Sequence, residues 1–376
     1  IAIMVFTICS INISTISGVI GAVVVSFSYT IYTNSNYAIV DVPTTFFITF
    51  FFVLLANYLH KNRLKKNQLY ILAILIGISI SMKYTAALLI PVLIYNSFLL
   101  LSKKHYQTLS SNSIRNLLSV VGSSFIFVGL ILLINYQNVL SYLQKLTTDG
   151  IIEIQYINTF NNLINLILVS GIFIVIVCLI KPETFDKRFF RYIISPLNFF
   201  LIMIISFTFM LLSPFTIIEL KNSFVDFMYE YRHMKIGSAA HYHHSSDIHK
   251  QILSELSFSN TFNFYKELLV MNIGIFGIMI LPFGLFHMYQ KNPTYFLSIL
   301  IYLILVIMTI MGWRNVAARY TLSFFPLLAV IIVEGLQFLK NLLTDRLPLH
   351  RNLCYLMLVA ILIIPMIKNF LFLFNI

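Results

Sequence analysis

The sequence predicts an all-α membrane protein, a bundle of helices that crosses the bilayer about ten or eleven times. Only 10% of the 376 residues are charged and 59% are hydrophobic, with a mean hydropathy of +0.89, whereas an ordinary soluble domain has about 25% charged residues. Apolar runs of about 18 to 25 residues recur, and each is long enough to cross a hydrocarbon core of about 30 Å as a helix. Their continuous hydrophobicity differs from the alternating pattern of a membrane β-strand.

The net charge of +12 has a topological meaning rather than indicating nucleic acid as a partner, because many of the bases lie in short loops between apolar runs. The loop from Lys61 to Lys66 and the loop from Lys181 to Arg191 each carry four basic residues. Both are expected to face the cytoplasm by the positive-inside rule. The protein is therefore expected to be a multi-pass protein of the cell membrane, with the lipid bilayer as its surroundings.

The first apolar run, IAIMVFTIC from Ile1, is only about half a membrane thick at about 1.5 Å per residue. It also lacks the charged region that begins a signal peptide. We expect the chain to be truncated at its N-terminus. The three cysteines, Cys9, Cys178 and Cys354, all lie in apolar runs, so no disulfides are expected.

The stretch from Leu69 to Leu101 is apolar over 33 residues, and both of its ends meet basic loops. A single crossing would place one basic end outside, so the pattern predicts two short helices that meet at an outer turn around Ser81 to Tyr84. A run from Ile114 to Ile134 then exits, and one from Leu163 to Ile180 returns. The later spans are expected near residues 197–212, 268–288, 294–311, 320–339 and 353–374.

This topology gives one transmembrane domain over residues 1–376, with a long external loop region at 213–266. The loops that begin at Tyr136 and Ser213 are the two long ones, and both are expected outside. Any chemistry is therefore expected on the outer face. No glycine-rich phosphate-binding motif is found, so a nucleotide-driven pump is not indicated.

Asp41, in AIVDVPTTFF, is the only acidic residue before Asp149 and stands where a helix is expected to begin. Asp is a favoured N-cap, and Pro43 is tolerated in a first helical turn. A carboxylate at the outer membrane boundary can also hold a polar substrate or take up a proton. The two interpretations, a cap alone and a cap with a catalytic role, both remain open.

Lys83, in ISISMKYTAALLIP, has no acidic neighbour in the sequence. A lysine at mid-bilayer costs about 2.5 to 3.5 kcal/mol on insertion scales, so it must reach an interface, pair with an acid, or face a polar cavity. At the outer turn it could simply extend to the interface. It could also bind the phosphate of a lipid-linked donor, with Tyr84 beside it.

The segment WRNVAARYTLSFFP places Trp313, Arg314, Arg319 and Tyr320 at another outer boundary. Aromatic and basic residues often lie at membrane interfaces, which is sufficient to explain this group. Arg319 immediately precedes a long apolar helix and could also clamp a phosphate with its planar guanidinium group. Tyr320 beside it is a further candidate for substrate binding.

Five of the nine histidines lie between Tyr231 and Lys250. His241, His243 and Asp247 could bind a divalent metal, although their spacing fits no common zinc motif, and a solvated polar loop explains them equally. In the preceding segment SFVDFMYEYRHMKIG, Glu230 and His233 would share one face of a helix lying on the outer surface. No cofactor is certain, and a metal is a possibility only.

Five stretches of the chain resemble the lipid-linked-sugar glycosyltransferases of family 39, which include the protein O-mannosyltransferases and the aminoarabinose transferases of lipid A. LYILAILIGISISMKYTAALLIPVLIYNSFLL is similar to the family's short helix pair with its glycine, lysine and proline. AIVDVPTTFFITFFFVLLANYL resembles its helix that opens with an aspartate. SPFTIIELKNSFVDFMYEYRHMKIG, NFYKELLVMNIGIFGIMILPFGL and AARYTLSFFPLLAVIIVEGL resemble the second half of its prokaryotic members.

The resemblance implies a fold of the GT-C type and an active site at the outer leaflet. It implies a polyprenyl-phosphate-linked sugar as donor, and a protein, lipid or glycan as acceptor. Lys83 and Arg319 would contact the lipid phosphate, Asp41 would be catalytic, and Glu230 and His233 would contact sugar or acceptor. The family's best-known catalytic aspartate has no counterpart here, because its loop would precede Ile1.

Two other functions remain open. A transporter or flippase of a lipid-linked sugar would need the same phosphate site and no catalytic acid, although no repeated halves are found. A noncatalytic membrane scaffold would use Asp41 only as a cap and Lys83 only at the interface.

Overall fold

The computed structural model describes residues 1–35, 40–61, 64–103, 195–218, 258–311, 317–346 and 351–372, with a few isolated positions between 126 and 172. In these ranges the regular structure is entirely helical and contains no strand, which confirms the all-α prediction. Five of the described helices are long and apolar enough to cross a membrane, and a bent pair would be a sixth. The predicted total of ten or eleven spans also counts runs outside the described residues.

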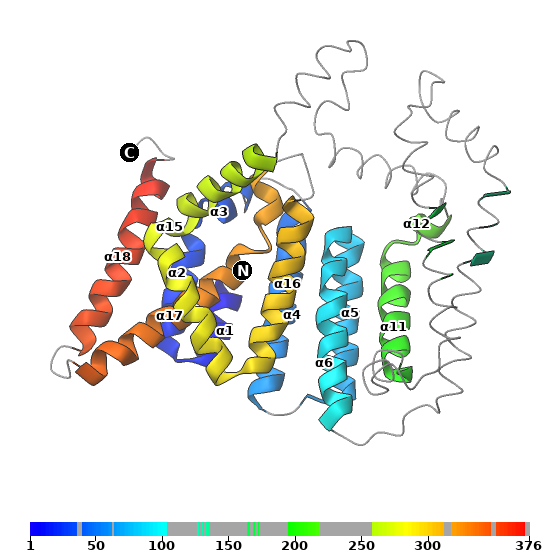
Figure 1. Ribbon diagram of the computed structural model, residues 1–376, viewed down its shortest axis with the longest axis horizontal. Coiled ribbons are helices and arrows are strands. Elements are labelled where there is room, and N and C mark those ends of the chain that lie inside the picture. Colours follow the sequence, from blue (N-terminus) through cyan, green and yellow to red (C-terminus); the bar gives the residue numbers. More distant parts are fainter. Residues whose placement is uncertain are drawn as a thin grey trace, which may run out of the picture. The chain divides into compact units, whose positions relative to one another are not determined.

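The helices, labelled as in Figure 1, are α1 (Ala2–Asn12), α2 (Thr15–Ser26), α3 (Tyr29–Ser35), α4 (Asp41–His60), α5 (Lys66–Met82), η1 (Tyr84–Leu88), α6 (Leu89–Lys103), α11 (Pro196–Leu212), α12 (Phe215–Ile218), α15 (Phe258–Lys291), α16 (Pro293–Met311), η3 (Ala318–Thr321), α17 (Phe325–Arg346) and α18 (Arg351–Phe372). The elements η1 and η3 are short 3-10 helices. Helices α2 and α3 form the bent pair, at 64° to each other.

The chain divides into two compact units. The larger contains residues 1–100, 201–218 and 228–376, and the smaller contains residues 101–200 and 219–227. The single transmembrane domain over residues 1–376 stays a prediction. Of the expected external loop region, residues 213–266, the structure describes only residues 213–218 and 258–266. The second of these segments belongs to α15.

The break predicted in the apolar stretch from Leu69 to Leu101 is confirmed. Helix α5 ends at Met82, and Lys83 has an extended backbone with φ −156° and ψ 129°. The Lys83 N–H still donates to the carbonyl of Ser79 at 3.0 Å, while the Lys83 carbonyl accepts from Ala86 N–H at 3.1 Å in η1. Lys83 is therefore the single residue at which the chain turns between the two helical segments.

Helices α15 and α17 pack with their backbones in contact. A β-carbon on Gly284 would lie 1.9 Å from the carbonyl oxygen of Ile331, and one on Gly335 would lie 2.7 Å from that of Ile280. Small residues at helix crossings allow this close approach in membrane bundles. The α17 side chains from Leu327 to Val333 are all nearly fully buried, so α17 is a central helix of the larger unit.

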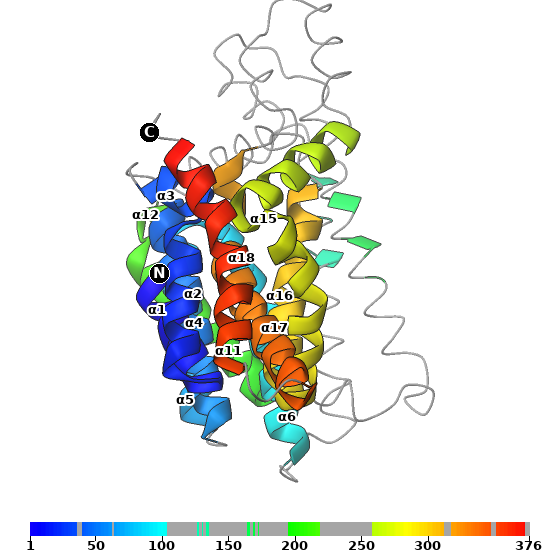
Figure 2. The same cartoon turned by 90° about the vertical axis from the view of Figure 1, so that its left-hand side faces the viewer.

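Helix α15 bends at Gly274, whose φ of 69° is readily adopted only by glycine. Figure 2 shows its first part leaning away from the direction of its second part. Two residues earlier, the buried Asn272 accepts hydrogen bonds from Ser28 Oγ at 2.6 Å and from Thr30 N–H at 2.9 Å. This amide fixes the start of α3, the element before α4, against α15.

Candidate functional site

Helix α4 brings the first site residue into place. It begins at Asp41, with Val40 in the N-cap position, so Asp41 lies in the first turn rather than at the cap predicted from the sequence. A carboxylate there is favoured by the partial positive charge of the helix N-terminus. Asp41 is buried, with 8% of its surface exposed. A carboxylate removed from water to this extent needs a partner.

Lys83 is that partner. Its Nζ donates a hydrogen bond to Asp41 Oδ1 and forms an ion pair with it. The two side chains are 17% and 11% exposed, so each charge compensates the other where water is scarce. The residues are 42 positions apart in the sequence, and the pair joins the start of α4 to the end of α5. Of the three possibilities open to this lysine, the structure shows pairing with an acid, and Lys83 also lines a pocket.

Tyr320, in η3, lies close to two cations. The Lys83 Nζ is 5.3 Å from the centre of the Tyr320 ring, and the Arg319 guanidinium carbon is also 5.3 Å from it. These distances suit attraction between a cation and the face of an aromatic ring. The guanidinium also donates to the Tyr320 hydroxyl at 3.5 Å. Tyr320 is 7% exposed, so it is a buried part of the site, while Arg319 is exposed.

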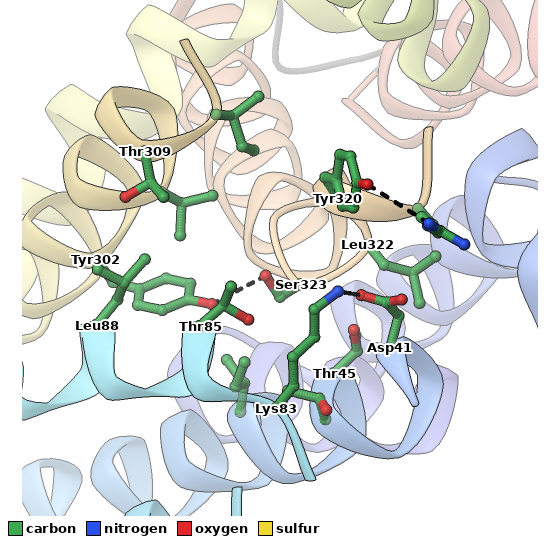
Figure 3. Close-up of a pocket in the computed structure, with 15 residues that line it drawn as sticks. Asp41, Thr45, Lys83, Thr85, Leu88, Tyr302, Thr309, Tyr320, Leu322 and Ser323 are labelled. Atoms are coloured by element: carbon green, nitrogen blue, oxygen red, sulfur yellow. Dashed lines mark hydrogen bonds and ion pairs between the residues drawn. The ribbon is translucent and has the colours of Figure 1, made fainter. Parts of the chain in front are cut away.

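A small pocket lies beside the ion pair, as Figure 3 shows. Its cavity volume is about 30 Å³. The wall combines several hydroxyl groups with aliphatic side chains, and the Tyr302 hydroxyl donates to Ser323 Oγ at 2.9 Å. The lining residues are Asp41, Thr44, Thr45, Ile48, Lys83, Thr85, Leu88, Tyr302, Val306, Thr309, Ile310, Arg319, Tyr320, Leu322 and Ser323. They come from α4, the α5–η1 junction, α16, η3 and the residues just after η3.

The structure brings together Asp41, Lys83, Arg319 and Tyr320, which the sequence analysis named separately. Tyr84 does not line this pocket. It is 47% exposed, and its ring lies 6.3 Å from that of Phe209 on α11. The remaining predicted residues, Glu230, His233, His241, His243, Asp247, Trp313 and Arg314, lie outside the described residues. In the described ranges, no group of three or more His, Cys, Asp or Glu side chains is placed to hold a metal ion.

Sequence reasoning missed the hydroxyl groups of the pocket. Thr44 and Thr45 follow Asp41 by three and four residues, so helical spacing places them on the same face, and this signal was available in DVPTT. Thr85 lies in η1, two residues after Lys83. Tyr302 and Thr309 carry no such signal, because their long apolar helix resembles any lipid-facing span.

The arrangement offers two cationic groups, one carboxylate and several hydroxyls within one lining. Ammonium and guanidinium groups bind phosphate through charge-assisted hydrogen bonds. A carboxylate within reach can accept a proton from a hydroxyl group. Threonine and serine hydroxyls can hydrogen-bond a polar molecule such as a sugar. The site therefore has the groups needed to hold a sugar phosphate.

Residues 1–144 match the family model of dolichyl-phosphate-mannose-protein mannosyltransferases, which confirms the resemblance predicted from the sequence for this part of the chain. The match includes Asp41 and Lys83, and Arg319 and Tyr320 lie beyond it. It supports a membrane glycosyltransferase in general. The search of curated proteins found no match, and neither did the search of solved structures.

Proposed function

We propose that this protein transfers a sugar from a polyprenyl-phosphate donor to an acceptor on the extracytoplasmic side of the membrane. The observation that carries the proposal is the meeting of Asp41, Lys83 and Arg319 in one pocket, from three segments far apart in the sequence. A phosphate-binding lysine, a second cation and a carboxylate are the groups that this reaction requires. The match of residues 1–144 to a mannosyltransferase family supports the same chemistry.

In the proposed reaction, the acceptor hydroxyl oxygen forms a bond to the anomeric carbon of the sugar. The bond from that carbon to the phosphate oxygen breaks, and the phosphate leaves with the electron pair. Asp41 takes the hydroxyl proton as a general base. Lys83 and Arg319 stabilise the charge that develops on the leaving phosphate.

The location of basic residues supports the extracytoplasmic side. Helix α4 begins at the pocket with Asp41 and ends next to Lys61, and α5 begins with Lys66 and ends at the pocket. Helix α15 ends with Lys291, whose Nζ donates to the carbonyl of Asn12. Basic residues mark the cytoplasmic ends of spans, so the pocket, at the other end of α4 and α5, would face outward.

Glu230 and His233 are proposed as further contacts to sugar or acceptor, in the part of the chain that the structure leaves undescribed. A metal held by His241, His243 and Asp247 is a further proposal for that segment. The acceptor would be a protein, lipid or glycan that presents a hydroxyl group.

The test is transfer of radiolabelled sugar from a panel of polyprenyl-phosphate sugars, with membranes that contain the full chain. Lys83→Ala and Asp41→Asn should each lower transfer at least a hundredfold while the protein remains inserted. Lys66→Ala is the matched control, because it removes a lysine at the opposite end of the same helix and should leave transfer unchanged. Full activity in both site variants would refute the proposal. Movement of labelled lipid across the membrane without transfer would support a flippase instead.

A further inference from the structure

The Lys83 ammonium is already bound to an anion of the protein itself. Asp41 Oδ1 accepts its hydrogen bond, and both side chains are mostly buried. The adjoining cavity of about 30 Å³ is lined by both Asp41 and Lys83. A phosphate group that reaches Lys83 therefore meets an ammonium that already binds a carboxylate.

We infer that the phosphate of the sugar donor and the Asp41 carboxylate compete for Lys83, so that phosphate binding releases Asp41 to interact with a hydroxyl group. This inference rests on the proposed function, because that function supplies the phosphate. It adds an order of events: the site binds the donor first and only then has a carboxylate free for the acceptor.

Charge is the first reason for competition. The single charge of the Lys83 ammonium cannot compensate a phosphate and a carboxylate together, and like charges repel strongly where water is scarce. Arg319 adds a second cation that favours the phosphate, and its guanidinium carbon lies 5.3 Å from the centre of the Tyr320 ring. The phosphate would gain two cations, whereas Asp41 is bound to Lys83 alone among the described interactions.

The Tyr320 ring explains how Lys83 can change partners without leaving the pocket. Its face lies 5.3 Å from Nζ and attracts the ammonium without carrying a charge of its own. Lysine is a compact cation on a flexible stem of four carbons. The ammonium can therefore turn from the carboxylate to a phosphate while the ring keeps it at the same place.

Release changes what Asp41 can do. In the ion pair, the hydrogen bond from the Lys83 ammonium occupies Oδ1, so only part of the acceptor capacity of the carboxylate is open to a hydroxyl group. Once released, the carboxylate stands in the first turn of α4 beside Thr44 and Thr45, with an oxygen available to an acceptor or sugar hydroxyl. Donor binding would thus prepare the carboxylate for its role in transfer.

The test measures equilibrium binding of farnesyl phosphate to the purified full chain in detergent. Asp41→Asn keeps the side-chain shape and removes the competing charge, so it should bind about tenfold more tightly than the wild type. Lys83→Met should bind about tenfold more weakly. In the double variant the gain from Asp41→Asn should disappear, because the competition requires Lys83.

Two controls separate this effect from general changes in charge or lipid binding. Glu334→Gln neutralises another buried carboxylate, on α17 and outside the pocket lining, and should leave farnesyl phosphate affinity unchanged. Farnesol has the same chain without phosphate and should bind all variants alike.

The outcomes distinguish the inference from the proposed function. Loss of affinity in Lys83→Met with no gain in Asp41→Asn would overturn the competition and leave the phosphate site intact. A gain in Asp41→Asn that persists in the double variant, or that extends to farnesol, would also overturn it. If Lys83→Met bound farnesyl phosphate as well as the wild type, both the inference and the proposed phosphate site would fail.

Discussion

His287 on α15 and Glu334 on α17 form a hydrogen bond of 2.7 Å between Nδ1 and Oε2, next to the place where the two backbones touch. Glu334 is 2% exposed and lies near the middle of an apolar helix. Ionisable side chains inside membrane proteins are costly unless they are paired. The hydrogen bond therefore fixes the position of α17 along α15, and α17 follows directly after η3 with Arg319 and Tyr320.

Loss of the Glu334 carboxylate should destabilise the larger unit. We expect Glu334→Ala to lower the free energy of unfolding by about 1 to 3 kcal/mol, because it leaves the partly buried His287 ring without its partner. Glu334→Gln keeps an oxygen that can accept from His287 and should retain most of the stability. Thermal unfolding in detergent measures both variants. Equal stability of Glu334→Ala and the wild type would show that the hydrogen bond contributes nothing.

The helix crossing should tolerate no side chain at Gly284. A β-carbon there would lie 1.9 Å from the carbonyl oxygen of Ile331, and a backbone atom cannot turn aside as a side chain can. Gly284→Ala should therefore cost several kcal/mol, more than the about 1 to 3 kcal/mol typical of core overpacking. The measurement is the yield and melting temperature of folded protein in detergent.

Gly277 on the same helix provides the matched control. The atoms nearest to a β-carbon on Gly277 would be side-chain atoms of Ile273 and Leu362, the closest at 3.1 Å. Gly277→Ala should be tolerated, with a gain in helix propensity that offsets the tighter contacts. Wild-type stability in Gly284→Ala would contradict the close approach of α15 and α17.

Hydrophobic runs and basic loops were sufficient to predict the helical class, the start of α4 near Asp41 and the break at Lys83. These are local features, since a helix boundary depends on nearby residues and on the charge of adjacent loops. The ion pair could not be predicted as such, because its two residues are 42 positions apart and meet only through packing. The sequence analysis had named both residues and left pairing as one of three possibilities for Lys83.

Glu334 and Tyr320 show why the rest could not be predicted. Glu334 stands within the apolar segment AVIIVEGL, and its partner His287 lies 47 residues earlier, so no spacing connects them. Tyr320 was named as a residue at an outer boundary and as a candidate for substrate binding, and neither interpretation predicts its burial. A 3-10 turn at Ala318–Thr321 places it among the helices, and a single turn of this kind leaves little signal in the sequence.

The Asn272 side chain should hold the start of α3. Its amide accepts from Thr30 N–H and donates to Thr30 Oγ1, both at 2.9 Å. Asn272→Leu leaves these buried groups unpaired, at a cost of about 1 to 3 kcal/mol. Amide hydrogen exchange at Thr30 should accelerate about tenfold or more, while exchange in α17 stays as in the wild type. Unchanged protection of Thr30 would show that other contacts hold α3.

The ring of Tyr320, rather than its hydroxyl group, should support the binding of phosphate by Lys83. Tyr320→Phe keeps the aromatic face at 5.3 Å from Nζ and loses the 3.5 Å contact between the hydroxyl and Arg319, so farnesyl phosphate affinity should change less than twofold. Tyr320→Leu removes the attraction of the ring for both cations, about 1 kcal/mol or roughly a fivefold loss of affinity. Titration of both purified variants in detergent measures this difference. If the phenylalanine variant lost as much affinity as the leucine variant, the hydroxyl and its contact with Arg319 would be the feature that matters.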